Sequence, residues 1–212
     1  KLLDVSTSEI YGGGIDGRCA ETMDKIVQGE TTVRLEYAVA KLAAETAIIN
    51  TCKVTPLRAS IVRPFNVAGP RQNGEGGFVL PRFIDQAMRG EPLTVFGDGQ
   101  QVRAFTHVGD IADGLMLIMQ HGRNAEADNL GNPSNKVSII SLAETVNQIV
   151  ESDGGIIRVD PRIIFGNLYA EAAEKYPDAR KSMDLGWYPL WGVARTIRSA
   201  YEYTKAHIAA PV

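Results

Sequence analysis

Short apolar runs typical of buried strands alternate along this chain with longer stretches of helical periodicity. The longest helical stretch is Glu36–Thr51, where apolar residues predict one buried face: Ala38, Val39, Leu42, Ala43, Ala47 and Ile48. Strands separated by helices of about ten to fifteen residues indicate a parallel sheet, because each parallel connection must cross over the sheet. We therefore expect an α/β fold.

The same alternation continues to the end of the chain. Helices are also expected at Phe83–Arg89, from Asp110 as N-cap through Met119, at Ser141–Glu151 and at Val193–His207. Strands are expected at Leu2–Ser6, Leu57–Val62, Leu93–Phe96, Val102–His107, Asp128–Leu130 and Ile156–Val159.

Composition argues against several classes of function. The 212 residues carry a formal charge of −3, and this near-neutral balance argues against a nucleic-acid partner, which usually needs a basic surface. No apolar run approaches the roughly 18 residues that span a bilayer, so no membrane segment is expected. Cys19 and Cys52 are the only cysteines, and the three histidines lack ligand spacing. We therefore expect no disulfide framework and no metal site.

Tyr37 and Lys41 stand four residues apart in the longest predicted helix, so their side chains share one helix face. A free phenol is a poor base at neutral pH, but a neighbouring ammonium stabilises the phenolate and makes the pair a candidate base for an alcohol. Tyr201 and Lys205 have the same spacing. Spacing alone does not choose between the pairs, and either could be an ordinary pair on a helix surface.

The context of the first pair distinguishes it from the second. The segment Ser6-Thr7-Ser8-Glu9 directly follows a predicted buried strand. Ligands of open α/β sheets bind beyond the carboxyl ends of the strands, where a hydroxyl and a carboxylate could face a substrate. Helix capping or turn formation is the alternative role for these residues.

These residues belong to a series of blocks spread over nearly the whole chain. The blocks are Ser-Thr-Ser-Glu-Ile-Tyr-Gly at 6–12, Tyr37 with Lys41, Arg-Pro-Phe-Asn-Val-Ala-Gly-Pro-Arg at 63–71, Gly-Glu-Pro-Leu-Thr-Val-Phe-Gly-Asp-Gly at 90–99, Arg-Ala-Phe-Thr-His-Val-Gly-Asp-Ile-Ala at 103–112, Asn-Leu-Gly-Asn at 129–132, and Pro-Asp at 177–178 with Leu-Gly-Trp at 185–187. Together they resemble the extended short-chain dehydrogenase/reductase family, and more narrowly its NAD-dependent nucleotide-sugar epimerases, dehydratases and decarboxylases.

The resemblance implies a fold and a division of the chain. The expected fold is α/β, the C-terminal part of a Rossmann-type parallel sheet with a smaller α/β substrate-binding region. Residues 1–70 would supply late strands and the catalytic helix of the NAD-binding domain. Residues 71–212 would mainly form the nucleotide-sugar domain, with some segments returning to the Rossmann sheet.

The resemblance also implies roles for individual residues. Tyr37 matches the catalytic base, Lys41 its partner, and Thr7 the hydroxyl that binds the reacting oxygen of the sugar. Glu9 matches a further catalytic position, and the cofactor NAD would contact Thr7, Tyr37, Lys41 and Pro64. Lys175 replaces an arginine that decarboxylase-like relatives place on the substrate, and it lacks the planar fork of arginine. The substrate-binding positions are Ser8, Asn66, Thr94, Phe96, Arg103, Tyr169 and Lys175.

The implied reaction is a transient oxidation at C4 of a nucleotide sugar, and the resemblance favours a UDP-linked sugar. The 4-keto sugar can then be reduced on the other face, lose CO₂ if it is a uronate, or eliminate water. Ser8 followed by Glu9 favours a decarboxylase-like site over a 4,6-dehydratase, which usually has aspartate at the Ser8 position. Phe78 stands where uronate decarboxylases often have arginine, so 4-epimerase and decarboxylase both stay open.

The glycine run Gly12–Gly17 fits the G-x-G-x-x-G pattern of a dinucleotide-binding site, but its sequence context does not. Its sequence context lacks the following apolar helix and the second strand with an acidic residue. We expect the true fingerprint to lie upstream of Lys1, which leaves an inactive or binding-only fragment as the alternative function. The resemblance further implies a homodimer through the helix that carries Tyr37, and a cytoplasmic location.

Overall fold

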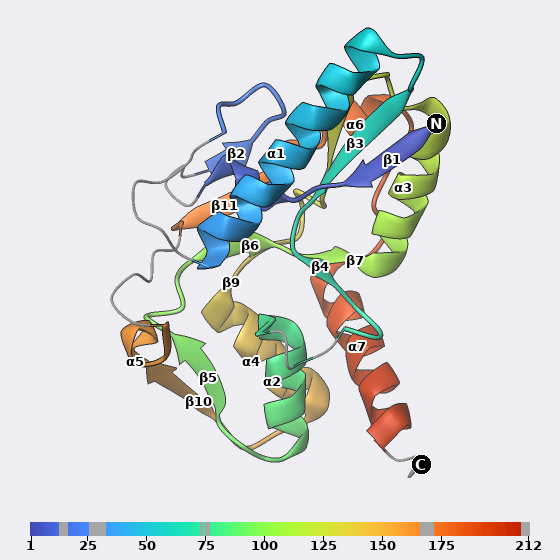
Figure 1. The fold of residues 1–212 in the computed structure, drawn as a ribbon. Coiled ribbons are helices and arrows are strands. Elements are labelled where there is room, and N and C mark those ends of the chain that lie inside the picture. The colour runs from blue at the N-terminus through green and yellow to red at the C-terminus, as the bar shows by residue number, and fades with distance from the viewer. Residues whose placement is uncertain (13–16, 26–32, 73, 75–76, 166–171, 209–212) are drawn as a thin grey trace.

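The computed structural model describes residues 1–12, 17–25, 33–72, 74, 77–165 and 172–208, and it has the expected α/β fold (Figure 1). Strands β1 (Leu2–Val5), β3 (Ala59–Pro64) and β8 (Glu126–Leu130) form a sheet in the order β1-β3-β8, with both pairings parallel. This architecture confirms the α/β class and the parallel sheet predicted from the alternation of strands and helices.

The β1-β3-β8 sheet lies between two long helices. Helix α1 (Val33–Val54) runs along one side of β1 and β3, and α3 (Val108–His121) lies on the other side (Figure 1). Val62 and Leu130 are fully buried in the core between the sheet and α3. Their removal from water is the main force that holds this layer together.

A second sheet has the order β2-β11-β6-β9. Strand β11 is parallel to both β2 and β6, whereas β6 and β9 are antiparallel. Two further parallel pairs are β5 with β10 and β4 with β7. The bounds are β2 Gly17–Cys19, β4 Val67–Ala68, β5 Leu93–Phe96, β6 Val102–Ala104, β7 Thr106–His107, β9 Lys136–Ser138, β10 Ile156–Val159 and β11 Glu174–Pro177.

Three helices gather at the end of the molecule away from β1 (Figure 1). They are α2 (Val79–Met88), α4 (Ile139–Val150) and α7 (Val193–Ile208), and they share a core that includes Phe83, Leu142 and Ile197. Short helical segments complete the described structure: η1 (Ser8–Tyr11), α5 (Pro161–Phe165) and α6 (Arg180–Asp184).

The apolar face predicted for α1 is only partly correct. Ala38 is buried and Leu42 is half-buried, but Val39, Ala43 and Ala47 are exposed. The helix instead turns the Glu45 carboxylate inward, where the side chain is only 3% exposed. A specific ionic contact, rather than a wide apolar stripe, therefore anchors the middle of α1.

The predicted cap of α3 is wrong by one turn. His107 is the N-cap, and its Nδ1 accepts the Gly109 amide at 3.0 Å. The carboxylate of Asp110 instead accepts the backbone amides of Leu190 and Trp191. Both residue types can accept such bonds, and tertiary contacts with the segment before α7 decide which of the two caps the helix.

The partner of Glu45 is Arg63 of β3, and the two form a buried bidentate ion pair. Arg63 Nη2 lies 2.7 Å from one carboxylate oxygen and Nε lies 3.0 Å from the other. Arg63 Nη1 also donates to the Tyr11 hydroxyl at 2.9 Å, and that hydroxyl donates to Asn129 Oδ1 at 2.8 Å. This network joins α1, β3, η1 and β8 through matched donors and acceptors.

Burial sets the charge states of the network. Burial alone would lower the pKa of Arg63, but the hydrogen bonds and charge of Glu45, together with Tyr11, raise it overall. Burial raises the pKa of Tyr11 to about 12, although the Arg63 charge opposes the rise. Arg63 is therefore a cation and Tyr11 a neutral phenol in the folded protein, as the hydrogen-bond directions require.

We expect Glu45→Gln to lower the free energy of unfolding by about 3–5 kcal/mol, because it leaves the Arg63 charge buried without its carboxylate. Urea unfolding followed by circular dichroism measures this loss. Asp85→Asn is the matched control, since it removes the carboxylate of the exposed Arg89–Asp85 pair and should barely move the unfolding midpoint. Equal effects of the two substitutions would contradict this account.

Candidate active site

The carboxyl end of β1 continues directly into a buried polar turn. Ser6, Thr7 and Ser8 are all at most 8% exposed. Thr7 is the N-cap of η1, and its Oγ1 accepts the Glu9 amide at 3.2 Å. The capping role considered for this segment is therefore real, and it fixes the Thr7 hydroxyl at the sheet edge where α/β proteins bind ligands.

Helix α1 brings Lys41 to the same edge. Lys41 Nζ donates to the carbonyl oxygen of Val5, the last residue of β1, at 2.8 Å. Tyr37 precedes Lys41 by one helical turn on the same face, and its side chain is about half exposed. Two of the four predicted catalytic residues, Thr7 and Lys41, therefore lie at the carboxyl end of β1, and Tyr37 shares the α1 face of Lys41.

The fourth, Glu9, meets a residue from the far end of the chain. Glu9 Oε1 lies 2.7 Å from Nζ of Lys175, which is on β11. The Lys175 side chain is 7% exposed and that of Glu9 is 39% exposed. On the neighbouring strand β6, Arg103 is in register with Lys175 and is also buried. Two predicted substrate-binding cations therefore stand side by side near the active-site turn.

Asn66 follows the end of β3 in a strained conformation. Its φ of 36° lies in the left-handed region, which few residues other than glycine adopt readily. Its carbonyl accepts the Thr106 amide, whereas its buried side-chain Oδ1 has no hydrogen-bond partner among the described residues. Pro64, two residues earlier, pairs with Leu130 at the end of β3. Strain and an unsatisfied polar atom are typical of residues kept for a ligand.

Thr94 and Phe96 lie on one face of β5 and are held by α2. Gln86 donates from Nε2 to the Thr94 hydroxyl and accepts the Thr94 amide. The Arg82 guanidinium lies 4.3 Å from the centre of the Phe96 ring and donates to the Thr94 carbonyl. Sequence reasoning missed both α2 residues, because a helical arginine and glutamine carry no motif of their own.

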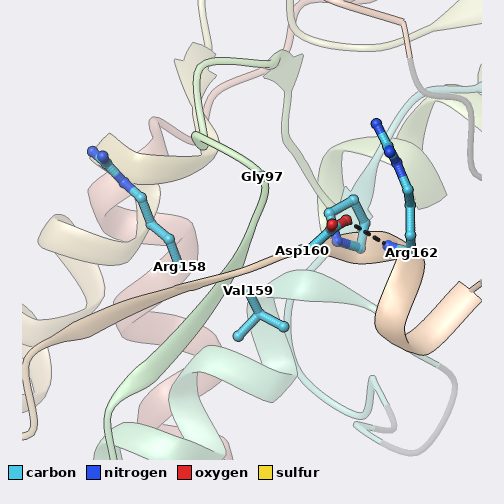
Figure 2. A pocket seen from close by; sticks show the side chains of 6 residues that line it. Gly97, Arg158, Val159, Asp160 and Arg162 are labelled. Atoms are coloured by element: carbon cyan, nitrogen blue, oxygen red, sulfur yellow. Dashed lines mark hydrogen bonds between the residues drawn. The ribbon is translucent and has the colours of Figure 1, made fainter.

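A shallow cavity of about 500 Å³ opens at the carboxyl ends of β5 and β10, next to Phe96. Figure 2 shows Arg158 and Arg162 on either side of Asp160, while Val159 points the other way. Asp160 accepts the Arg162 amide at 2.9 Å. None of its lining residues was predicted as a site residue. Gly97 belongs to the block at 90–99, but residues 158–162 lie outside the recognised sequence blocks.

The remaining sequence predictions have different outcomes. Tyr169 lies outside the described residues. Tyr201 and Lys205 lie on α7, with the ammonium 5.5 Å from the ring centre, beside the α2–α4–α7 core. The glycine run leads into strand β2 rather than into a helix, which is the wrong context for a dinucleotide fingerprint.

Two negative findings concern the described part of the chain. None of its helices is long and apolar enough to cross a membrane. It also contains no group of three or more histidine, cysteine, aspartate or glutamate side chains that could hold a metal ion.

Comparison with known proteins shows which family the chain belongs to. The model of the NAD dependent epimerase/dehydratase family matches residues 1–131, more than half of the chain. The chain belongs to this family. The resemblance seen in the sequence blocks is therefore confirmed.

Decarboxylases are prominent among the curated relatives of this family member. It is 33% identical over 186 residues to a UDP-N-acetyl-alpha-D-glucosaminuronate decarboxylase of Bacillus cytotoxicus, covering 87% of this chain and 57% of the relative. It is 35% identical over 190 residues to UDP-glucuronic acid decarboxylase 6 of Arabidopsis thaliana, covering 89% and 53%. The chain thus spans about half the length of the curated relatives it matches.

Solved structures of the family have the same fold. A UDP-glucuronic acid 4-epimerase of Bacillus cereus in complex with NAD superposes with a TM-score of 0.81 at 25% identity, covering 97% of this chain and 61% of that one. A UDP-glucose 4-epimerase of Thermotoga maritima gives 0.84 at 25% identity, covering 97% and 63%. These matches confirm the Rossmann-like α/β class.

The polar turn after β1 has a buried side chain that suits a polar ligand group such as one of NAD. Ser6 is 2% exposed, and its hydroxyl oxygen has no hydrogen-bond partner among the described residues. It stands at the carboxyl end of β1 between Val5, which binds Lys41, and Thr7. An unpartnered buried hydroxyl at this edge is suited to a polar ligand group.

We expect Asn66→Gly to keep the free energy of unfolding within about 0.5 kcal/mol of the wild type or above it, because glycine adopts positive φ without strain. Asn66→Ala should lower it by about 1 kcal/mol or more, since a Cβ without a polar side chain gains nothing in this conformation. Urea unfolding compares the two. A glycine variant as unstable as the alanine variant would show that the Asn66 side chain stabilises the fold.

Proposed function

We propose that this protein modifies a UDP-linked uronic acid by NAD-dependent oxidation at C4, followed by loss of CO₂. The observation that carries the proposal is the position of Thr7, Glu9 and Lys41 around the turn after β1, with Tyr37 one helical turn before Lys41 on α1. The decarboxylase relatives support the same reaction. Because the chain spans about half of those relatives, the proposal concerns the protein made from the whole reading frame.

Each residue at the turn has a proposed task. Lys41 stabilises the phenolate form of Tyr37, and this phenolate takes the proton from the C4 hydroxyl of the sugar and becomes a neutral phenol. Thr7 orients the reacting oxygen, and Thr7, Tyr37, Lys41 and Pro64 would contact the nicotinamide half of the cofactor. NAD⁺, when bound, supplies the acceptor for the C4 hydride. A carboxylate β to the resulting ketone is then easily lost as CO₂, because the carbonyl accepts the electron pair of the broken C5–C6 bond.

The substrate would extend from this turn toward β6 and β5. Arg103 would bind the diphosphate, for which a guanidinium fork is well suited. Ser8 and Asn66 would contact the sugar or diphosphate, and Thr94 and Phe96 would lie around the nucleobase of the substrate. Contacts with α2 hold Thr94 and Phe96 in place, which supports a preformed binding site for the nucleobase. Tyr169 stays a candidate substrate contact.

Epimerisation at C4 of the same uronate is the second candidate. Phe78 supports it, because this exposed residue stands where uronate decarboxylases often have arginine. A 4,6-dehydratase is less well supported, since Ser8 replaces the aspartate usual in that subfamily. We further propose a homodimer that covers the exposed Val39, Ala43 and Ala47 of α1, and a cytoplasmic location where nucleotide sugars are available.

The deciding experiment incubates the protein from the whole reading frame with NAD⁺ and UDP-glucuronate. Release of carbon dioxide supports the decarboxylase, and formation of UDP-galacturonate supports the epimerase. No change in this substrate would contradict both uronate functions and favour a binding-only protein.

The two tyrosine–lysine pairs provide a matched test of the proposed base. Tyr37→Phe should lower turnover by about 100-fold or more, the usual effect of losing a general base, with little change in nucleotide-sugar affinity. Tyr201→Phe removes the same hydroxyl from the pair on α7 and should leave turnover within about twofold. Steady-state kinetics measures both, and equal losses would show that the wrong pair was chosen.

A further inference from the structure

The Glu9–Lys175 ion pair connects two parts of the molecule that different segments build. Glu9 lies in η1, the short helical segment that follows β1 of the β1-β3-β8 sheet, and Lys175 lies in the β2-β11-β6-β9 sheet. Their contact of 2.7 Å joins residues 166 positions apart in the sequence. The geometry therefore couples the active-site turn to the sheet that carries Arg103.

The two partners differ in how far a ligand could reach them. Lys175 is buried at 7% side-chain exposure, whereas Glu9 retains 39%. The lysine lies in register between Gly17 of β2 and Arg103 of β6. A molecule that enters the site thus meets the carboxylate before the ammonium.

We propose that Lys175 is a positioning residue that holds Glu9 ionised and oriented toward the sugar, and not itself the contact to the substrate. This inference rests on the proposed function for the identity of the sugar. An ionised carboxylate only accepts hydrogen bonds, so Lys175 keeps Glu9 available to accept from a sugar hydroxyl. A lysine suits this task, because one compact charge needs no bidentate partner.

Other charged groups surround the pair. Burial raises the pKa of the Cys19 thiol on β2, while the Lys175 charge lowers it and the Glu9 charge raises it. The thiol therefore stays neutral. Arg103 is the neighbour of Lys175 on β6, and α1 brings Lys41 to the same turn. Loss of Lys175 would remove a cation that contacts Glu9 directly, at 2.7 Å, while these groups stay in place.

Lys175→Met tests the proposal in the full-length protein. The acid limb of the kcat–pH profile should shift to higher pH by about one unit. The reason is that the Glu9 carboxylate protonates more readily without the Lys175 ammonium beside it. At neutral pH, kcat should fall several-fold while KM for the nucleotide sugar changes less than about threefold, as expected for a residue that acts through another. Lys175→Arg should restore most of the loss.

Lys136→Met is the matched control. Lys136 is on β9 of the same sheet and stacks on Tyr176 at 4.2 Å, so it projects from the face opposite to Lys175. Its replacement should leave the pH profile unchanged. A tenfold rise in KM for Lys175→Met with an unmoved pH profile would overturn the proposal and make Lys175 a substrate contact.

A titration separates this inference from the proposed function. Carbon-13 NMR of labelled glutamate carboxyls, with Glu9→Gln to assign the signal, follows Glu9 without any substrate. The midpoint pH of the Glu9 titration should rise in Lys175→Met and not in Lys136→Met. An unchanged midpoint would overturn the inference even if the protein proves to be a decarboxylase, and a raised midpoint would support it even if UDP-glucuronate is not turned over.

Discussion

The buried ion pair between Arg63 and Glu45 is the contact on which the active-site geometry depends. Arg63 binds α1 through Glu45 and η1 through Tyr11, and Tyr11 binds β8 through Asn129. Helix α1 has few buried apolar residues, so a hydrophobic stripe alone would hold it loosely. Because the fork of Arg63 engages both carboxylate oxygens, the pair also fixes the rotation of the helix.

That rotation matters for the chemistry. Lys41 lies one turn before Glu45 on α1, and Tyr37 lies one turn before Lys41. With Glu45 held against β3, Lys41 reaches the last carbonyl of β1. The ionic network thus orients the proposed base relative to Thr7, while Lys175 positions Glu9 from the second sheet. Two ion pairs, one buried and one partly exposed, therefore fix the elements around the proposed catalytic turn.

Local sequence patterns predicted the elements well, and the contacts between distant segments poorly. The strand-then-turn pattern at Ser6–Glu9 placed Thr7 at the sheet edge, because parallel strands present ligand sites at their carboxyl ends. The Glu9–Lys175 contact could not be deduced, since nothing local relates residues 166 positions apart. The inward turn of Glu45 was missed for the same reason, as its partner lies on another element. His107, and not Asp110, caps α3, because the Asp110 carboxylate accepts hydrogen bonds from the backbone amides of Leu190 and Trp191.

Hydrogen–deuterium exchange on Glu45→Gln tests most directly whether the Arg63–Glu45 pair positions the site. The amides of α1 and η1 should exchange faster than in the wild type, while those of α2 and α4 in the separate α2–α4–α7 core keep their protection. Unchanged exchange in α1 and η1, or a uniform increase over the whole protein, would contradict this central claim.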